Sequence, residues 1–181
     1  APLPRQGLWR ERLAAIAADA SPALALMAGD NIEALDGILP AERFVRTDRM
    51  HADGSVDPRL FQSRAVDTAL LQFSSGTTGE AKGIVITHDN LLHQARVICK
   101  AFDPSPDEVV VTWLPLYHDM GLISGIVMPL YLGVHSWLMS PEMFVARPLR
   151  WLKCIMDARA SFCVAPDFAY AYCAQRIDAA A

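Results

Sequence analysis

Two short stretches of this sequence concentrate residue types that could do chemistry, and the first is residues 74–83, SSGTTGEAKG. Hydroxyls, glycine N–H groups and one ammonium group gathered in a loop form a donor set that suits a phosphate. The spacing is not that of the Walker loop, because Ala81 precedes Lys82 and Gly83 follows it. The pattern alone leaves two interpretations open: a phosphate-binding loop of another kind, or a glycine-rich hairpin with a solvated lysine at its tip.

The second stretch is residues 113–121, WLPLYHDMG, in which His118 stands beside Asp119. An imidazole next to a carboxylate can be a catalytic group or a structural loop pair, and both interpretations stay open. The other histidines form no cluster with ligand spacing, so no metal site is expected from them. Ser75 lies outside a G-x-S-x-G elbow, which argues against a serine nucleophile. The apolar residues 122–132 could line a pocket or simply pack in the core.

Strands that alternate with helices must position both stretches, which predicts an α/β fold with a mainly parallel sheet flanked by helices. Apolar runs predict strands at residues 23–27, 44–45, 70–73, 84–86, 109–112, 135–139 and 161–164. Apolar stripes and caps predict helices at residues 8–20, 30–35, 91–102, 122–131, after Ser140, around 151–156 and after Asp167. Sites in such sheets lie at the carboxyl ends of strands, so the loops after Phe73, Thr112 and Val164 are expected to face one crevice.

Composition narrows the class of protein. The 181 residues are 52% hydrophobic and carry a net charge of −4, which favours a well-buried core and gives no reason to expect a nucleic-acid partner. The four cysteines show no CxxC pair, which predicts buried free thiols in a reducing compartment. No apolar run is long enough for a membrane span, and no signal peptide is evident, so a cytoplasmic location is expected. Because the chain lacks an initiator Met, we expect a piece of a longer protein.

Residues 73–83, FSSGTTGEAKG, resemble the phosphate-binding signature of the adenylate-forming superfamily, which includes acyl-CoA synthetases, luciferases and fatty acyl-AMP ligases. Glu80 and Ala81 depart from the family pattern, which usually has Pro just before the lysine. Residues 113–123, WLPLYHDMGLI, are similar to the fatty acyl-AMP ligase form of the second core motif. The likeness continues in residues 129–133, 138–141, 147–151 and 165–170, although many of these ligases have two glycines before Pro166.

The resemblance implies a reaction in two halves. The carboxylate of a fatty acid attacks the α-phosphorus of ATP, giving acyl-AMP and pyrophosphate, and the phosphopantetheine thiol of an acyl carrier protein then takes the acyl group. Such chemistry demands neutralisation of several negative charges by oriented donors and Mg²⁺.

The resemblance also implies roles for particular residues. The residues expected to hold the β- and γ-phosphates of ATP are Ser74, Ser75, Gly76, Thr77, Thr78 and Gly79. Thr77 or Thr78 would help hold Mg²⁺, and Lys82 would be a mobile counter-charge. His118 would lie near the substrate carboxylate and the α-phosphate, with Asp119 beside it. Met120 and Gly121 would sit at the mouth of an acyl tunnel, with residues 122–132 along it.

The same likeness sets the expected domain organisation. Residues 1–181 would be a single incomplete segment of the AMP-binding N-terminal domain, with a connecting loop at 46–67 and a motif-bearing part at 68–181. The adenine- and ribose-binding groups and the C-terminal subdomain would lie outside it, so the isolated segment is expected to be inactive. Two alternatives stay open: a fatty acyl-CoA synthetase that uses coenzyme A, and a non-catalytic nucleotide- or acyl-binding or interaction module.

Overall fold

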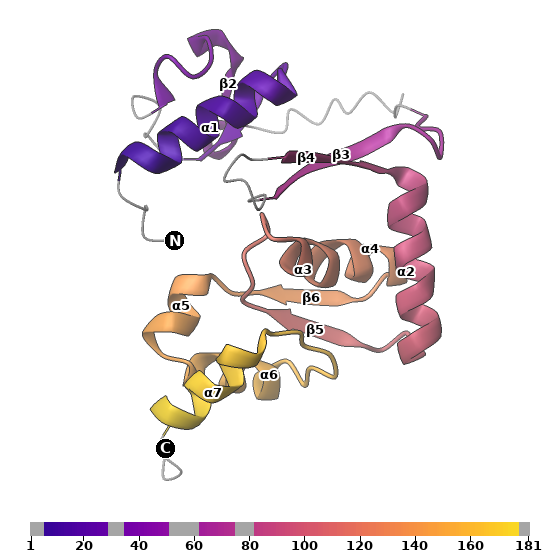
Figure 1. The fold of residues 1–181 in the computed structure, drawn as a ribbon. Helices are drawn as coiled ribbons and strands as arrows, with labels where there is room; N and C mark the ends of the chain where they lie inside the picture. Colours follow the sequence, from indigo (N-terminus) through magenta and orange to yellow (C-terminus); the bar gives the residue numbers. More distant parts are fainter. Residues whose placement is uncertain (1–5, 29–34, 51–61, 75–81, 178–181) are drawn as a thin grey trace. The chain divides into compact units, whose positions relative to one another are not determined.

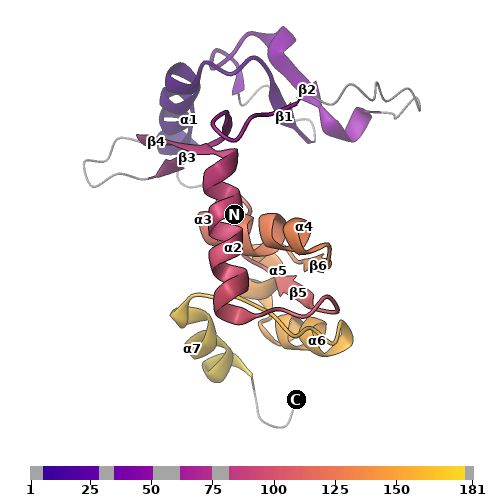
Figure 2. The same cartoon turned by 90° about the vertical axis from the view of Figure 1, so that its right-hand side faces the viewer.

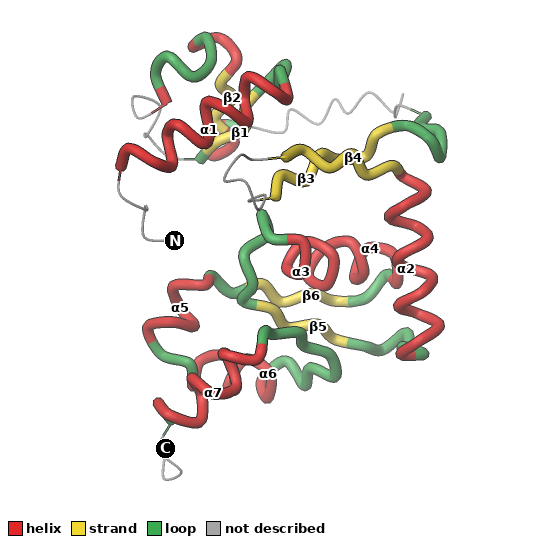
Figure 3. Tube along the Cα trace, viewed as in Figure 1, coloured by secondary structure: helices red, strands yellow, loops and turns green. Residues whose placement is uncertain are grey.

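The computed structural model of the protein describes residues 6–28, 35–50, 62–74 and 82–177. It divides into two compact units, residues 2–89 and residues 90–181, which are shown as a ribbon in Figure 1 and by secondary structure in Figure 3. None of the helices among the described residues is long and apolar enough to cross a bilayer.

The first unit opens with helix α1 (Gln6–Ala20), where the apolar stripe predicted a helix. Strands β1 (Ala25–Met27) and β2 (Phe44–Arg46) pair in parallel, and the short 3-10 helices η2 (Ala41–Arg43) and η3 (Thr47–Arg49) flank β2. Both strands were predicted, but β1 is not buried as expected, because Leu26 is 70% exposed. The helix predicted at 30–35 and most of the loop predicted at 46–67 lie outside the described residues.

Strands β3 (Thr68–Ser74) and β4 (Lys82–Thr87) form an antiparallel pair. Only seven residues, 75–81, separate the two strands in the sequence, which is too few for the crossover that a parallel pair requires. The expectation of a mainly parallel sheet therefore does not hold for this pair. The prediction that residues 70–73 are buried is also wrong for Leu71, which is 42% exposed beside its cross-strand partner Val85.

The second unit is built around β5 (Val109–Thr112), which pairs in parallel with β6 (His135–Leu138) on one side. On its other side β5 makes a single parallel bridge from Val110 to Phe162. The strand predicted at 161–164 is thus wrong, because among these residues only Phe162 forms a bridge to β5. The central position predicted for β5 is confirmed, since three of its four residues are buried.

Helix α2 (His88–Phe102) begins at the predicted capping segment and ends before Pro104. A continuous helical segment follows the loop after β5 and consists of α3 (Asp119–Leu122), the π-helical turn η4 (Ile123–Val127) and α4 (Met128–Leu132). It begins three residues earlier than the helix predicted at 122–131, because the His118 side chain caps its first turn. Gly133, at φ +70°, ends the segment as predicted.

Helices cover both faces of the β5–β6 pair. Successive strand residues point to opposite faces, so Thr112 meets Gly125 of η4, whereas Val111 packs in the core formed with α5 (Pro141–Ala146), α6 (Leu149–Asp157) and α7 (Asp167–Arg176). Both views show α3 and α4 on one side of the strands and α6 and α7 on the other (Figures 1 and 2). Strand β5 therefore contacts η4 on one face and the core with α5, α6 and α7 on the other.

The predicted N-cap of α5 is confirmed, whereas that of α7 is wrong. The Ser140 hydroxyl caps α5 by accepting from the N–H of Met143 at 3.3 Å, as predicted. Asp167 does not cap α7, because Pro166 holds the capping position and Asp167 is the first helical residue. All four cysteines are free thiols, as expected, but only Cys173 is buried, whereas Cys99, Cys154 and Cys163 are half-buried. Burial raises the pKa of the Cys154, Cys163 and Cys173 thiols.

Candidate functional site

The loop that carries His118 leaves the carboxyl end of β5 and is anchored where it begins. The Thr112 hydroxyl is buried and accepts from the N–H of Leu114 at 3.1 Å. The Trp113 ring stacks on Phe144, with centroids 3.9 Å apart, and meets the Trp151 ring edge-on at 6.2 Å. The buried indole N–H groups of Trp113 and Trp151 have no hydrogen-bond partner among the described residues, so ring packing holds this anchor.

His118 caps α3, which is why the helix starts at Asp119. Its Nδ1 accepts from the N–H of Met120 at 3.2 Å and also lies 2.7 Å from Asp119 Oδ1. These two contacts require different protonation of Nδ1: an unprotonated Nδ1 accepts from Met120, whereas an Nδ1–H, in the other neutral tautomer or in the imidazolium, donates to the Asp119 carboxylate. In the tautomer that accepts from Met120, the proton sits on Nε2, which becomes a donor.

The imidazole is accessible as well as oriented. The His118 side chain is 59% exposed and that of Asp119 is 73% exposed. Nε2 has no hydrogen-bond partner among the residues that the structure describes. Met120 N–H also donates to Asp119 Oδ1 at 2.6 Å, so the first turn of α3 is well satisfied. The arrangement presents one N–H donor of an imidazole to a negatively charged or carbonyl oxygen.

Gly121 brings the helix and the loop together. A Cβ at this position would lie 2.3 Å from the carbonyl oxygen of Pro115, a backbone atom that cannot move aside without moving the loop. The His118 N–H donates to the same carbonyl at 3.0 Å, closing a turn. Gly121 is therefore required by packing. Its expected place at the mouth of an acyl tunnel, with Met120, stays a prediction.

The π-helical turn fixes the same segment to the strands. Gly125 packs so closely on β5 that a Cβ there would lie 2.7 Å from Thr112 Cγ2. The Ser136 hydroxyl of β6 donates to the Gly125 carbonyl at 2.7 Å, and the Ser124 hydroxyl donates to the Met120 carbonyl at 2.6 Å. Sequence reasoning missed these positioning residues, although two glycines four residues apart in an apolar helix were a usable signal.

The other predicted chemical stretch belongs to the first unit. Ser74 ends β3 and Lys82 begins β4, and the two residues pair directly across the strands. Lys82 is exposed, and a Cβ at Gly83 would lie 3.1 Å from the Phe73 ring, so this end of the pair is tightly packed. Ser75, Gly76, Thr77, Thr78 and Gly79 lie outside the described residues. The hairpin interpretation and the phosphate-loop interpretation are compatible, since a hairpin connection can carry the donors.

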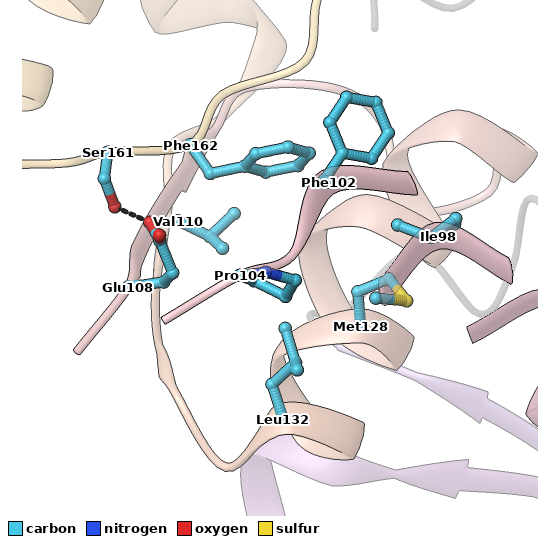
Figure 4. Close-up of a pocket in the computed structure, with 9 residues that line it drawn as sticks. All are labelled: Ile98, Phe102, Pro104, Glu108, Val110, Met128, Leu132, Ser161 and Phe162. Carbon is cyan, nitrogen blue, oxygen red and sulfur yellow. Dashed lines mark hydrogen bonds between the residues drawn. The ribbon is translucent and has the colours of Figure 1, made fainter. Parts of the chain in front are cut away.

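Metal-ligating groups do not gather in the described part of the chain: no cluster of three or more His, Cys, Asp or Glu side chains occurs there. The Mg²⁺ ligands expected at Thr77 and Thr78 fall outside it. A cavity of about 260 Å³ lies in the second unit near the amino end of β5 (Figure 4), and no residue of the His118 loop lines it. Apolar side chains that include Phe102, Met128 and Phe162 line it, and the Ser161 hydroxyl donates to the Glu108 carboxylate at one side.

The sequence matches a known protein family. The family model described as "AMP-binding enzyme" matches residues 5–180, almost the whole chain. The chain belongs to the AMP-binding enzyme family. The resemblance of its two motifs to the adenylate-forming superfamily is thereby confirmed.

Two curated relatives are named as ligases of fatty acids. Over 111 residues the chain is 46% identical to the medium-chain-fatty-acid–[acyl-carrier-protein] ligase TtuA of Teredinibacter turnerae, an alignment that covers 61% of the chain and 17% of TtuA. It is 33% identical to the long-chain-fatty-acid–AMP ligase FadD26 of Mycobacterium tuberculosis, over 96% of the chain and 31% of FadD26. The chain thus spans less than a third of these curated relatives.

A solved structure shows the same fold. The fatty acyl-adenylate ligase of Legionella pneumophila, solved with acyl adenylate and pyrophosphate, matches 97% of the chain and 31% of that protein with a TM-score of 0.85 and 32% identity. The α/β arrangement described above is therefore part of the large N-terminal domain of an adenylate-forming enzyme.

Proposed function

We propose that the full-length protein to which this chain belongs is a fatty acyl-AMP ligase, which activates a fatty acid with ATP and passes the acyl group to the phosphopantetheine thiol of an acyl carrier protein. The observation that carries the proposal is the His118 loop: a rigidly anchored, exposed imidazole at the carboxyl end of the central strand. The names of TtuA and FadD26, which are ligases of fatty acids, support the choice of substrate.

The chemistry of the donor set suits ATP. The stretch from Ser74 to Lys82 supplies hydroxyls, glycine N–H groups and one ammonium group to the β- and γ-phosphates. Mg²⁺, which Thr77 or Thr78 would help hold, supplies positive charge to the phosphate oxygens. Lys82, at the start of β4, neutralises charge on the departing pyrophosphate. These groups lower the electrostatic barrier to attack by one anion on another.

His118 positions the reacting carboxylate. In the neutral tautomer whose Nδ1 accepts from Met120, Nε2–H donates to an oxygen of the fatty acid or of the α-phosphate. The carboxylate oxygen forms the new bond to the α-phosphorus and the bond to the pyrophosphate oxygen breaks. In the second half the carrier thiol attacks the acyl carbonyl carbon, and AMP leaves with the carboxyl oxygen bound to phosphorus. Placement of the reacting groups accounts for the catalysis, with no covalent enzyme intermediate.

Acyl loading of the carrier tests this proposal. The full-length protein is incubated with ATP, Mg²⁺, a fatty acid and either a phosphopantetheinylated carrier protein or coenzyme A, and the products are measured by mass spectrometry. A carrier that gains the mass of the acyl group is expected. Acyl-coenzyme A as the main product would favour the synthetase alternative. If acyl-carrier protein, acyl-coenzyme A and acyl-AMP are all absent, a non-catalytic module would be favoured.

A further inference from the structure

The transfer half of the proposed reaction has one proton whose acceptor is not yet assigned. The thiolate is the nucleophile, and an alkyl thiol such as that of Cys has an ordinary pKa of about 8.5, so most of a phosphopantetheine thiol is protonated near pH 7. A group that takes this proton must lie beside the acyl carbon that the sulfur attacks. Because that carbon is bonded to the carboxyl oxygen, the proposed function already places the His118 ring beside it.

The short contact between His118 and Asp119 favours a ring that can accept a proton at Nε2. Nδ1 lies 2.7 Å from Asp119 Oδ1. At this distance an unprotonated nitrogen and a carboxylate oxygen repel each other, whereas an Nδ1–H donates a charge-assisted hydrogen bond to the carboxylate. With the single proton of the neutral ring on Nδ1, Nε2 carries a lone pair and is a base.

The first turn of α3 tolerates this tautomer, because the N–H group that the ring caps has a second acceptor. The Met120 N–H donates to Asp119 Oδ1 at 2.6 Å as well as to His118 Nδ1 at 3.2 Å. When Nδ1 carries the proton, the shorter of these two bonds remains, and Asp119 accepts from both the ring and the backbone. The ring can therefore exchange one tautomer for the other without leaving a helix N–H unsatisfied.

We propose that His118 is the general base of the transfer half-reaction and that Asp119 is the positioning residue that holds its basic tautomer. Nε2 takes the proton of the thiol, and an electron pair of the sulfur forms the bond to the acyl carbon. The bond from that carbon to the oxygen of AMP then breaks, and AMP leaves with the oxygen and the electron pair. The imidazolium, whose charge the Asp119 carboxylate stabilises, passes its proton to solvent. This inference rests on the proposed function, because it requires an acyl-AMP and a thiol acceptor.

Transfer from purified acyl-AMP isolates this half-reaction. The full-length wild type and His118→Asn are mixed with acyl-AMP and either a phosphopantetheinylated carrier protein or coenzyme A, and thioester formation in a single turnover is corrected for the rate without enzyme. Near pH 7 the variant should lose roughly 100-fold or more with whichever acceptor the wild type uses. The loss should shrink roughly ten-fold or more by about pH 9.5, because the thiol then ionises without a base.

Asp119→Asn tests the positioning role. The Asn side chain retains an acceptor for the Met120 N–H but is neutral, so transfer near pH 7 should fall roughly three- to ten-fold, since exposure screens part of the lost charge. This smaller loss should also shrink as the pH rises. The matched control is Asp89→Asn, which removes an exposed carboxylate from the first turn of α2 and should transfer at the wild-type rate at every pH.

Transfer by His118→Asn at the wild-type rate would overturn the assignment of a base. A loss of constant size across the pH range would overturn it as well, because the ring would then position the acyl-AMP without taking a proton. An equal loss in Asp119→Asn and Asp89→Asn would remove the role of Asp119. In a wild type that catalyses ATP–pyrophosphate exchange, these results refute this inference alone, whereas absence of exchange in the wild type would refute the proposed function.

Discussion

At the scale of single residues, His118 combines a structural role and a chemical role in one ring. Nδ1 caps α3, and in the tautomer that does so the neutral ring has its proton on Nε2, where it can be donated. Sequence reasoning identified this residue from its neighbours and from family resemblance. It did not identify the capping role, because His is not among the residues usually expected at a helix N-cap.

Two substitutions separate these roles. His118→Asn keeps a second side-chain acceptor for the Met120 N–H, whereas His118→Ala leaves it only the bond to Asp119, so the alanine variant should lose less than about 1 kcal/mol of stability and the asparagine variant almost none. Both variants lack the Nε2 donor and should lose roughly 100-fold or more in fatty-acid-dependent pyrophosphate exchange. Thermal unfolding and exchange assays of the full-length protein check this. Wild-type exchange in the asparagine variant would leave His118 with a capping role only.

Gly121 gives a second prediction at this scale. Gly121→Ala places a methyl group against the Pro115 carbonyl, so it should cost about 1–3 kcal/mol and reduce exchange by displacing the His118 loop. The control is Gly133→Ala, where φ is +70° and a Cβ would meet no atom within 4 Å. That variant should lose ~1 kcal/mol through backbone strain and keep its exchange activity. Full activity in Gly121→Ala would show that the close approach has no role in the site.

At the scale of secondary-structure elements, the register between η4 and β5 is set by a contact between Gly125 and Thr112. Gly125→Ala should destabilise the protein by about 1–3 kcal/mol, because the new methyl group would collide with Thr112 Cγ2. Thr112→Ser removes that Cγ2 and keeps the hydroxyl that accepts from Leu114. In a double-mutant cycle measured by thermal unfolding, the double variant should therefore be more stable than the sum of the two single changes predicts. Strict additivity would argue against this contact.

Most elements could be predicted from the sequence because their periodicity is local. The β-branched run at Val109–Thr112 and the cap at Ser140 both predicted what the structure shows. The features that could not be predicted depend on partners distant in sequence or on detailed side-chain geometry. The strand expected at 161–164 makes one bridge to Val110, and the Thr112 hydroxyl that holds the His118 loop could not be told from an ordinary strand residue.

At the scale of the whole molecule, the two predicted chemical stretches belong to different compact units. Lys82 begins β4 in the first unit, and the His118 loop lies in the second. Within the second unit, the bridge between Val110 and Phe162 is parallel, so the segments that follow Thr112 and Val164 leave at the same edge. The predicted meeting of the Phe73 loop with them in one crevice stays a prediction. Family resemblance joined the stretches into one site, because periodicity and composition carry no information about such a long-range arrangement.

The most direct test of the account is fatty-acid-dependent ATP–pyrophosphate exchange by the full-length protein, compared among the wild type, Lys82→Ala, His118→Ala and the surface control Lys100→Ala. The wild type and Lys100→Ala should exchange at equal rates, whereas each site variant should lose roughly 100-fold or more, because each lacks a group that stabilises developing charge. Exchange at the wild-type rate in both Lys82→Ala and His118→Ala would contradict the assignment of the site.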